Sequence, residues 1–405
     1  MVHKLPLEGV KVVDFGVVIT GPLVGRALAE YGAQVVKVES IHGREFARVS
    51  SPYLGGIPGI DRSLLFNAVN TNKLSIQLNL RHAASRSVIE RLVAWADVMV
   101  VNLRPGALKR LRLDYPHIHK VRPDIIMLAM SQAGQTGPHA DHPGYGGQTM
   151  GLAGFVHATG WPDREPSGPG TAYTDYVAPW YALVAVLAAL DKRRRTGAGG
   201  YFDLSVLEAS LMNLAPALLE CVANGRVPTR QGNASPVAAP HGAYRCQGED
   251  RWCVIAVSTE EEWERFRLAL GNPPWAQRPE FANLESRLAH QDALNAHIEK
   301  WTAEHTADEV MVRLQAAGVP AGVVRTTAEV TADAQLAHRG HFYEVANSGV
   351  GPYYAQRMPF RLSRVGELPR QAAPRLGEHT EYVCRSLLGM SDEEFVTLLR
   401  SGAFE

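Results

Sequence analysis

The N-terminal third of the chain alternates β-branched apolar runs with helical patterns, and this alternation limits the possible folds more than any other feature. The apolar runs predict strands over 10–15, 34–39, 75–78, 98–101 and 125–130, and the segments between them predict helices over 21–31, 83–96 and 107–111. Strands and helices that alternate in this way form a parallel sheet with helices on both faces. The sequence therefore predicts an α/β fold.

The first β-α-β unit invites comparison with dinucleotide-binding proteins, in which an acidic residue at the end of the second strand binds the ribose. Glu39 stands at that place. However, Gly16, Gly21 and Gly25 do not form the G-x-G-x-x-G pattern that lets a turn approach a pyrophosphate closely. A nicotinamide-dependent dehydrogenase is therefore not expected.

A second domain is predicted in the C-terminal half. After a helix predicted over 203–219, the Pro-, Gly- and Ala-rich segment 226–242 is typical of a linker. Capping boxes pair Thr259 with Glu262 and Thr306 with Glu309 at the starts of two helices. Strands are predicted over 242–245, 252–257 and 321–325. This pattern indicates a compact α+β domain.

The charge balance argues against nucleic acid and membranes as partners. Lys plus Arg and Asp plus Glu each total 41, so the chain has no overall positive field. The apolar run 176–190 is shorter than the ~20 residues that span a bilayer. The four cysteines are scattered and the N-terminus lacks a signal-peptide pattern, so we expect a cytoplasmic protein. The histidines lack companion ligands at metal spacing, and no metal is expected.

Asp175 directly precedes the apolar run 176–190, in the sequence Gly170-Thr171-Ala172-Tyr173-Thr174-Asp175-Tyr176. A helix with so few polar residues is expected to be buried, and its first turn borders both the interior and any cleft beside it. Free N–H groups and a partial positive charge at the start of a helix stabilise an anion. Asp175 is therefore either an N-cap or a covalent nucleophile, and the local sequence leaves both open.

Four further motifs stand in one order: Leu7-Glu8-Gly9-Val10-Lys11-Val12-Val13-Asp14-Phe15, Gly32-Ala33-Gln34-Val35-Val36-Lys37-Val38-Glu39, Asn102-Leu103-Arg104-Pro105-Gly106 and Leu376-Gly377-Glu378-His379-Thr380. Together with the Asp175 run, they resemble the family III CoA-transferases over nearly the whole chain. The resemblance implies a Rossmann-like, discontinuous large domain formed by 1–227 and 331–405, with a smaller α+β domain inserted over 228–330. It also implies an interlocked dimer, in which the small domain of one chain faces the nucleophile of the other.

The resemblance implies that Asp175 accepts the acyl group in a reaction that moves CoA between carboxylic acids, through an aspartyl mixed anhydride and an aspartyl-CoA thioester. CoA thioesters are then substrates, and no permanently bound cofactor is expected. Positions that match the family imply CoA contacts for Val18, Ile19, Lys73, Asn102, Leu103 and Arg110. Without the resemblance, Arg110 is typical of a solvated helix face together with Lys109 and Arg112.

Two further groups of residues are predicted to surround the reacting carbonyl. Gly144, Tyr145, Gly146 and Gly147 are candidate N–H donors to an oxyanion, with an ordinary flexible turn as the alternative. Arg44, Arg48 and Arg62 follow the second strand, and Arg48 is the leading candidate to hold the free carboxylate of a dicarboxylyl-CoA such as succinyl-CoA. The context of residues 174–176 also resembles transferases of C4 dicarboxylates and benzylsuccinate.

Other functions stay open at this point. An α-methylacyl-CoA racemase or epimerase shares the fold but needs a second acid-base residue, and Tyr145 stands where that group has histidine. Some relatives also work as pairs of homologous subunits, and one subunit of such a pair can be a non-catalytic binding subunit. Because this chain keeps Asp175, it would be the active member of such a pair. Formyl or oxalyl transfer is not expected, since Ile19 and Ser40 replace the glutamine and arginine of formyl-CoA transferases.

Overall fold

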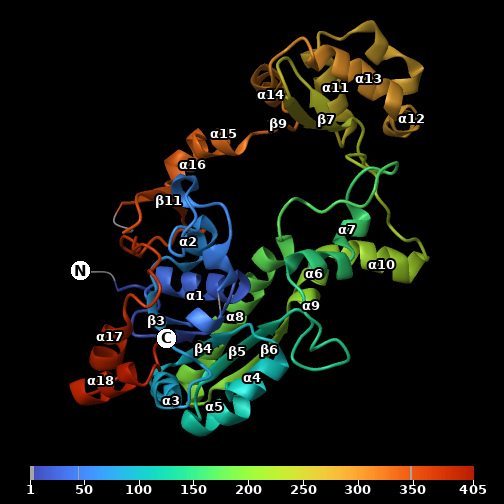
Figure 1. Ribbon diagram of the computed structural model, residues 1–405. Helices are drawn as coiled ribbons and strands as arrows, with labels where there is room; N and C mark the ends of the chain where they lie inside the picture. Colours follow the sequence, from blue (N-terminus) through green and yellow to red (C-terminus); the bar gives the residue numbers. More distant parts are fainter. Residues whose placement is uncertain (1–3, 44, 347–348) are drawn as a thin grey trace. The chain divides into compact units, whose positions relative to one another are not determined.

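The structure is a computed structural model that describes residues 4–43, 45–346 and 349–405 (Figure 1). Arg44 therefore lies outside the described residues. The chain divides into a large unit, which runs up to Val156 and includes Gly168–Pro228 and Ala337–Glu405, and a small unit of His157–Ser167 and Thr229–Leu336. The predicted small domain, 228–330, begins one residue before Thr229 and ends six residues before Leu336 of this small unit. Segment 157–167, which was expected in the large domain, groups with the small unit.

A six-stranded parallel sheet forms the centre of the large unit, in the order β3-β2-β1-β4-β5-β6. The strands are β1 (Lys11–Asp14), β2 (Gln34–Glu39), β3 (Leu74–Gln77), β4 (Val98–Val101), β5 (Ile126–Ser131) and β6 (Gly200–Ser205). The predicted parallel sheet is confirmed, since the first five strands lie within one residue of their expected bounds. The strand order reverses between β1 and β4, and sheets of this type bind ligands beside such a switch point.

The sixth strand corrects the sequence analysis. Residues 203–205, which were predicted to begin a helix, pair with β5, and the N-cap of α9 (Val206–Leu211) is Ser205, whose Oγ accepts a hydrogen bond from Glu208 N. A 3-10 turn at Met212–Leu214 separates α9 from α10 (Ala215–Asn224). The strand was missed because Asp203 is a frequent N-cap residue type and because only its last side chain is fully buried.

Alternating strand side chains build an apolar core on each face of the sheet. Val13 and Met99 point to the face covered by α3 (Ser85–Trp95), α5 (Tyr115–Val121) and the C-terminal α18 (Asp392–Arg400). Val12 and Val98 point to the face covered by α1 (Thr20–Glu30) and α8 (Tyr173–Thr196). Figure 1 shows these helices on both sides of the sheet. Shorter helices of this unit are α2 (Leu64–Asn70), α4 (Pro105–Leu111), α6 (Gly146–Leu152) and α7 (Phe155–Ala158), the last of which runs into the small unit.

The last segment of the chain packs on the large unit. The strands β10 (Phe342–Val345) and β11 (Tyr353–Gln356) form an antiparallel hairpin. The motif 376–380 then attaches to β3, because Gly377 N donates to Ser75 Oγ and His379 N donates to Ser75 O. The chain continues into α17 (Thr380–Tyr382), a π-helical turn (Val383–Leu387) and α18. This motif therefore holds the returning chain on the edge strand of the sheet.

An antiparallel three-stranded sheet forms the small unit, in the order β7 (His241–Arg245), β8 (Trp252–Ala256) and β9 (Ala321–Val323). Both predicted capping boxes are confirmed, at the starts of α11 (Glu260–Ala269) and α14 (Ala307–Ala316). The remaining helices are α12 (Leu284–Ala289), α13 (Gln291–Thr302), α15 (Thr327–Thr331) and α16 (Ala334–Arg339), the last of which crosses into the large unit.

The composition of α8 predicted a helix buried on all sides, and this prediction is wrong. A stripe of small side chains that includes Ala178, Ala182 and Val186 packs on the sheet, whereas Trp180 and Val184 are exposed. By length and composition alone, α8 and the helical stretch Val206–Asn224 are apolar enough to cross a membrane. This is weak support for a membrane segment, since the core helix of a globular protein passes the same test.

Candidate active site

A hollow of about 100 Å³ lies at the carboxyl ends of β1, β4 and β5, beside the switch point of the sheet. It brings together six of the predicted site residues: Val18, Ile19, Asn102, Gly144, Tyr145 and Asp175. Its lining also includes residues that the sequence analysis did not select: Val17, Thr20, Ser131, Gln132, Thr149 and Val206. The residues come from segments far apart in the sequence, and the sheet places them around one small space.

Asp175 lies in the first turn of α8, half-buried in the wall of this hollow. The N-cap of α8 is Ala172, so the alternative that Asp175 is the N-cap is wrong. Burial raises the pKa of the Asp175 carboxyl to about 6, and a hydrogen bond from Gly146 N–H offsets part of this rise. No cationic side chain in the described part of the chain contributes to that pKa. The carboxylate is thus mostly ionised at neutral pH and poorly solvated, as covalent nucleophiles require.

The glycine run 144–147 was predicted to supply N–H donors to an oxyanion, and the structure gives one of these N–H groups a different partner. Gly146 N–H hydrogen-bonds Asp175 itself, so it is not a free donor to an oxyanion. A Cβ at Gly144 would lie 1.8 Å from Gln132 Oε1, whereas a Cβ at Gly147 would meet nothing within 4 Å. The Tyr145 ring is 63 % exposed and stacks on Phe46, with the ring centroids 6.0 Å apart.

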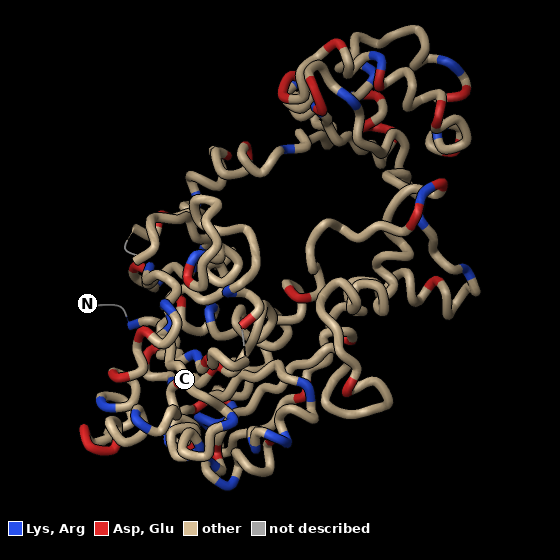
Figure 2. The backbone as a smooth tube through the Cα atoms, in the orientation of Figure 1, with Lys and Arg blue, Asp and Glu red and all other residues tan. Residues whose placement is uncertain are grey.

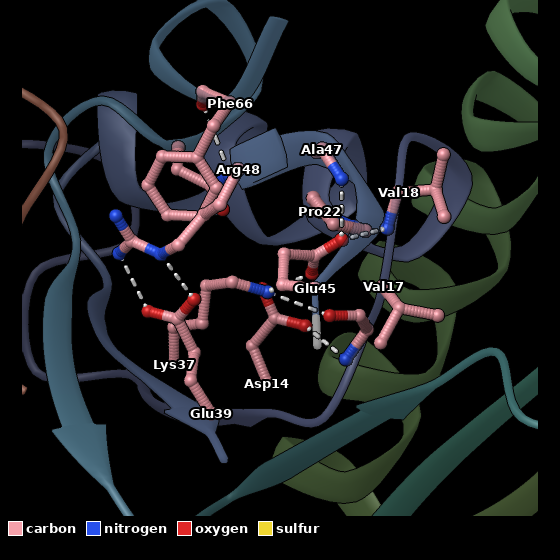
Figure 3. Close-up of polar contacts among 12 residues, drawn as sticks. Asp14, Val17, Val18, Pro22, Lys37, Glu39, Glu45, Ala47, Arg48 and Phe66 are labelled. Carbon is pink, nitrogen blue, oxygen red and sulfur yellow. Dashed lines mark hydrogen bonds and ion pairs between the residues drawn. The ribbon is translucent and has the colours of Figure 1, made fainter. Parts of the chain in front are cut away.

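The loop between β1 and α1 forms another wall of the hollow in a strained conformation. Val18 has a φ of +62°, which is costly for a β-branched residue. Asn102 holds the loop, because its Oδ1 accepts from Val17 N at 2.7 Å and its Nδ2 donates to Val17 O at 2.8 Å. Glu45 Oε1 accepts from Val18 N at 2.7 Å, and Lys37 Nζ donates to Gly16 O at 2.6 Å (Figure 3). Asn102 therefore lines the hollow itself and also holds the adjacent loop.

A buried ion pair between Lys37 and Glu45 also holds the loop between β1 and α1. Lys37 Nζ lies 3.1 Å from Glu45 Oε2, and the Lys37 side chain is fully buried. Burial favours the neutral amine, but the carboxylates of Glu45, Asp14 and Glu39 more than offset it, so the pKa of Lys37 is raised. The lysine therefore stays charged and keeps its hydrogen bond to the loop.

Lys73, which was predicted to contact CoA, is also part of this buried network. Its Nζ donates to Asp14 Oδ2 at 2.7 Å and to Pro22 O and Asn70 Oδ1, each at 2.8 Å. Burial lowers the pKa of Lys73 to about 8, although Asp14 partly opposes this. All three N–H groups are in use, which leaves no donor for a CoA phosphate and removes Lys73 from the candidate site.

Arg48 was the predicted anchor for a substrate carboxylate, and the structure gives it carboxylate partners of its own. Its side chain is 2 % exposed. Nε and Nη2 bind the two oxygens of Glu39, and Nη1 binds Asp61 Oδ1 at 2.7 Å. The carbonyls of Ile60 and Pro374 take the other donors, and the guanidinium stacks on Phe66 (Figure 3). With every donor occupied, Arg48 stabilises the fold and is not available as the anchor.

Two further hollows continue from the Asp175 site within the large unit. One of about 180 Å³ shares Val17 with the first hollow and is lined by the predicted CoA contact Leu103. Another of about 720 Å³ shares Leu80 and Ala107 with the second and contains Arg110. Arg81, Arg86 and Arg112 also line it, and Figure 2 shows basic residues around this end of the unit, near α3, α4 and α5. Leu103 and Arg110 thus line hollows that are linked to the Asp175 hollow by shared residues, and the hollow with Arg110 is basic.

Ser131 and Gln132 are the most informative residues that the sequence analysis did not select. They stand at and directly after the end of β5, and both line the Asp175 hollow. A signal for them was present in the sequence, because residues at the carboxyl ends of parallel strands next to a switch point form the ligand crevice.

The fold and the site together define an α/β protein with a desolvated carboxylate at the switch point of its sheet and a basic surface that leads away from it. The CoA-transferase family III profile matches residues 7–380, and the chain belongs to this family. The chain is 32 % identical over 397 residues to succinyl-CoA–D-citramalate CoA-transferase of Chloroflexus aurantiacus, covering 97 % of this chain and 96 % of that protein.

Two more similarities agree with this assignment. The chain is 32 % identical over 397 residues to the beta subunit of succinyl-CoA–L-malate CoA-transferase from the same organism, covering 96 % of each chain. A crystal structure of a CaiB/BaiF family protein from Brucella suis has a TM-score of 0.86 at 32 % identity, covering 95 % of this chain and 100 % of that one. The predicted family and enzyme class are confirmed. The racemase alternative is not favoured, and the described lining of the Asp175 hollow contains no histidine.

Proposed function

We propose that this enzyme transfers CoA from a short dicarboxylyl-CoA, such as succinyl-CoA, to another carboxylic acid, with Asp175 as the covalent nucleophile. The observation that carries the proposal is the Asp175 carboxylate, which is half-buried in a small hollow and held by Gly146 N–H. The two similar transferases from Chloroflexus aurantiacus are both named for succinyl-CoA, which supports the choice of donor. Nothing in the hollow selects the acceptor acid.

The reaction balances without a net proton transfer. An oxygen of Asp175 attacks the thioester carbonyl of the donor, the C–O bond forms, the C–S bond breaks, and CoA leaves as a thiolate. The thiolate then attacks the Asp175 carbonyl carbon of the mixed anhydride, which releases the donor acid as a carboxylate and leaves an aspartyl-CoA thioester. The acceptor carboxylate attacks this thioester, and the thiolate returns to the acceptor acyl carbon. Asp175 is regenerated as a carboxylate.

The shape of the site fits this order of events. An acyl head group in the 100 Å³ hollow leaves little room for water, which would hydrolyse the anhydride and the thioester. The CoA chain would run past Leu103 toward the 720 Å³ hollow, where Arg110 and its neighbouring arginines supply charge for phosphates. The thioester and the phosphates would thus occupy opposite ends of one surface.

The distal carboxylate of a dicarboxylyl group needs a cation, and the described lining of the Asp175 hollow contains no Lys or Arg. We infer that a second chain completes the site, in a homodimer or with a homologous subunit. Exposed apolar side chains on α8 and α10 support such an assembly: Val184 is 68 % exposed and Val222 is 85 % exposed, with Trp180, Leu187 and Leu219 also exposed. Apolar surface of this kind is typical of protein interfaces.

A donor and acceptor screen of the purified protein tests the proposal, with the mass of the same sample measured by light scattering. We expect exchange with succinyl-CoA and trapping of wild-type Asp175 by hydroxylamine during turnover, seen by peptide mass. Asp175→Ala should bind CoA esters without transfer. A preference for monocarboxylyl donors would remove the dicarboxylate proposal, a folded monomer would remove the two-chain site, and an Asp175→Ala variant with normal exchange would remove the mechanism.

A further inference from the structure

The hydroxyl of Ser131 is buried in the wall of the Asp175 hollow and has no hydrogen-bond partner. The residue is 7 % exposed, and no described residue bonds its Oγ. Gln132, the next residue, also has a buried and unpaired Oε1 in the same hollow. A buried polar group without a partner is destabilising, whereas a ligand that pairs with it removes this cost. The two atoms therefore mark a polar part of the wall whose hydrogen bonds a bound group can complete.

Ser131 differs in this respect from the other buried serines of the described chain. Each of the others has a partner: Ser63 Oγ donates to Ser50 O, Ser75 Oγ to Glu39, Ser85 Oγ to Ala403 O and Ser210 Oγ to Val206 O, and Ser205 Oγ accepts from Glu208 N. The fold thus pairs each of these five buried serine hydroxyls. At Ser131 it leaves one unpaired, in the lining of the hollow that also contains Asp175.

The size of the hollow places Ser131 close to any group that Asp175 attacks. Ser131 and Asp175 both line this one space of about 100 Å³.

Other polar groups of the hollow have partners within the fold. Gly146 N–H is bound to Asp175. Thr149 Oγ1 donates to Tyr145 O, and Thr20 Oγ1 accepts from Asn102 Nδ2. The described lining contains no Lys, Arg or His. Of the lining hydroxyls, Ser131 is the one that is buried and has no hydrogen-bond partner among the described residues.

We propose that Ser131 Oγ–H donates a hydrogen bond to the carbonyl oxygen of the acyl group while Asp175 attacks it. This inference rests on the proposed function of Asp175. As the Asp175 oxygen bonds to the carbonyl carbon, the π-electron pair of the carbonyl moves onto its oxygen, and the Ser131 hydroxyl stabilises that charge. No proton leaves the serine. The carbonyl re-forms when the CoA thiolate departs, and the same contact is available for the reverse attack.

The test compares Ser131→Ala with a matched control, Ser210→Ala, in the full-length protein. Removal of one oxyanion donor typically lowers kcat by about 10²–10³-fold, so we expect that loss for Ser131→Ala with KM for succinyl-CoA little changed. Its Tm should stay the same or rise, because no hydrogen bond is lost. Ser210 is buried, lies outside the lining of the hollow and bonds Val206 O at 2.6 Å, so Ser210→Ala should lower Tm and keep kcat.

Several results would overturn the inference. A Ser131→Ala variant with unchanged kcat removes it, and so does a variant in which only KM rises, since that marks a ground-state contact. If Ser131→Ala does not fold, Ser131→Cys, which keeps the size but weakens the donor, should still show the kcat loss. Hydroxylamine trapping on wild-type Asp175 separates the two proposals. If the wild type gives an adduct and Ser131→Ala turns over normally, only the role of the serine is removed. If the wild type gives neither exchange nor an adduct, both proposals are removed.

Discussion

The backbone N–H of Gly146 hydrogen-bonds the carboxylate of Asp175, and a Cβ at residue 146 would lie 2.5 Å from Asp175 Oδ2. The same Cβ would lie 2.7 Å from the Cβ of Ala172, the N-cap of α8. The start of α6 therefore packs directly against the nucleophile, at a distance that only glycine permits. This contact sets the position of the carboxylate and explains why glycine stands at position 146.

Gly146→Ala should lower kcat/KM by about 100-fold or more, since displacement of a reacting group by about 1 Å can have that effect. Gly147→Ala is the matched control, because it lies in the same helix and its Cβ meets nothing within 4 Å. Steady-state exchange rates and Tm values of both variants check this. Normal turnover in Gly146→Ala would show that the carboxylate is not held by this contact.

Activity should fall on the acid side with an apparent pKa of about 6, the value to which burial raises Asp175. The carboxyl attacks only when it is ionised, so kcat/KM should drop about tenfold for each pH unit well below that pKa. An ordinary aspartate would place this limb near pH 4. A profile of kcat/KM between pH 4.5 and 8 decides between them, and full activity at pH 5 would mean that the carboxylate is well solvated.

Asp175→Asn should be more stable than the wild type at pH 7.5. The pKa of the folded carboxyl is raised, so the folded state binds more protons than the unfolded state between pH ~4 and ~6, and wild-type stability falls as pH rises through this window. Asparagine keeps an acceptor for Gly146 N–H and carries no charge. We expect a gain of about 1–2 kcal/mol above pH 6, which disappears near pH 4. Denaturant unfolding at both pH values measures it, and an equal difference at both would exclude the charge as the cause.

Arg110→Ala should raise KM for CoA esters by about tenfold and leave kcat nearly unchanged. Arg110 lines the 720 Å³ hollow away from Asp175, and a contact to the unreacting phosphates is equal in ground and transition states. Arg194→Ala is the control, because Arg194 is at the far end of α8, where it pairs with Asp191 and its side chain is 80 % exposed. If Arg110→Ala changes only the KM of the acid substrate, the arginine lies at the acyl end.

The sheet could be predicted because each of its first five strands is a short β-branched run, and local sequence decides such elements. β6 and the exposed face of α8 could not be predicted in this way. Strand β6 depends on pairing with β5, which lies about 70 residues earlier. The α8 side chains are apolar on every face, so the composition carries no information on which face meets the sheet.

The site shows the same division between local and long-range information. Asp175 stands out locally, because an acidic residue directly before an apolar run has few roles. The role of Lys73 depends on a remote partner, since Asp14 lies 59 residues away. The carboxylates that bind Arg48, Glu39 and Asp61, lie only 9 and 13 residues away, but their pairing with it depends on how the chain folds after β2. A basic residue in a loop looks available until the carboxylates that the fold brings to it are known.

Arg48→Met therefore tests the fold and not the substrate pocket. Removal of the guanidinium leaves Glu39, which is 4 % exposed, without its main partner. Breaking a buried ion pair by removing one member typically costs 3–5 kcal/mol, and we expect about that loss of unfolding free energy. Arg62→Met should cost less, because among the described residues Arg62 donates to the carbonyls of Leu54 and Val350 and to no buried carboxylate. Denaturant unfolding and KM for succinyl-CoA are measured on both variants. The opposite outcome is a stable Arg48→Met enzyme whose KM is raised for succinyl-CoA and unchanged for monocarboxylyl-CoA donors. That result would show that Arg48 leaves Glu39 and binds the substrate carboxylate.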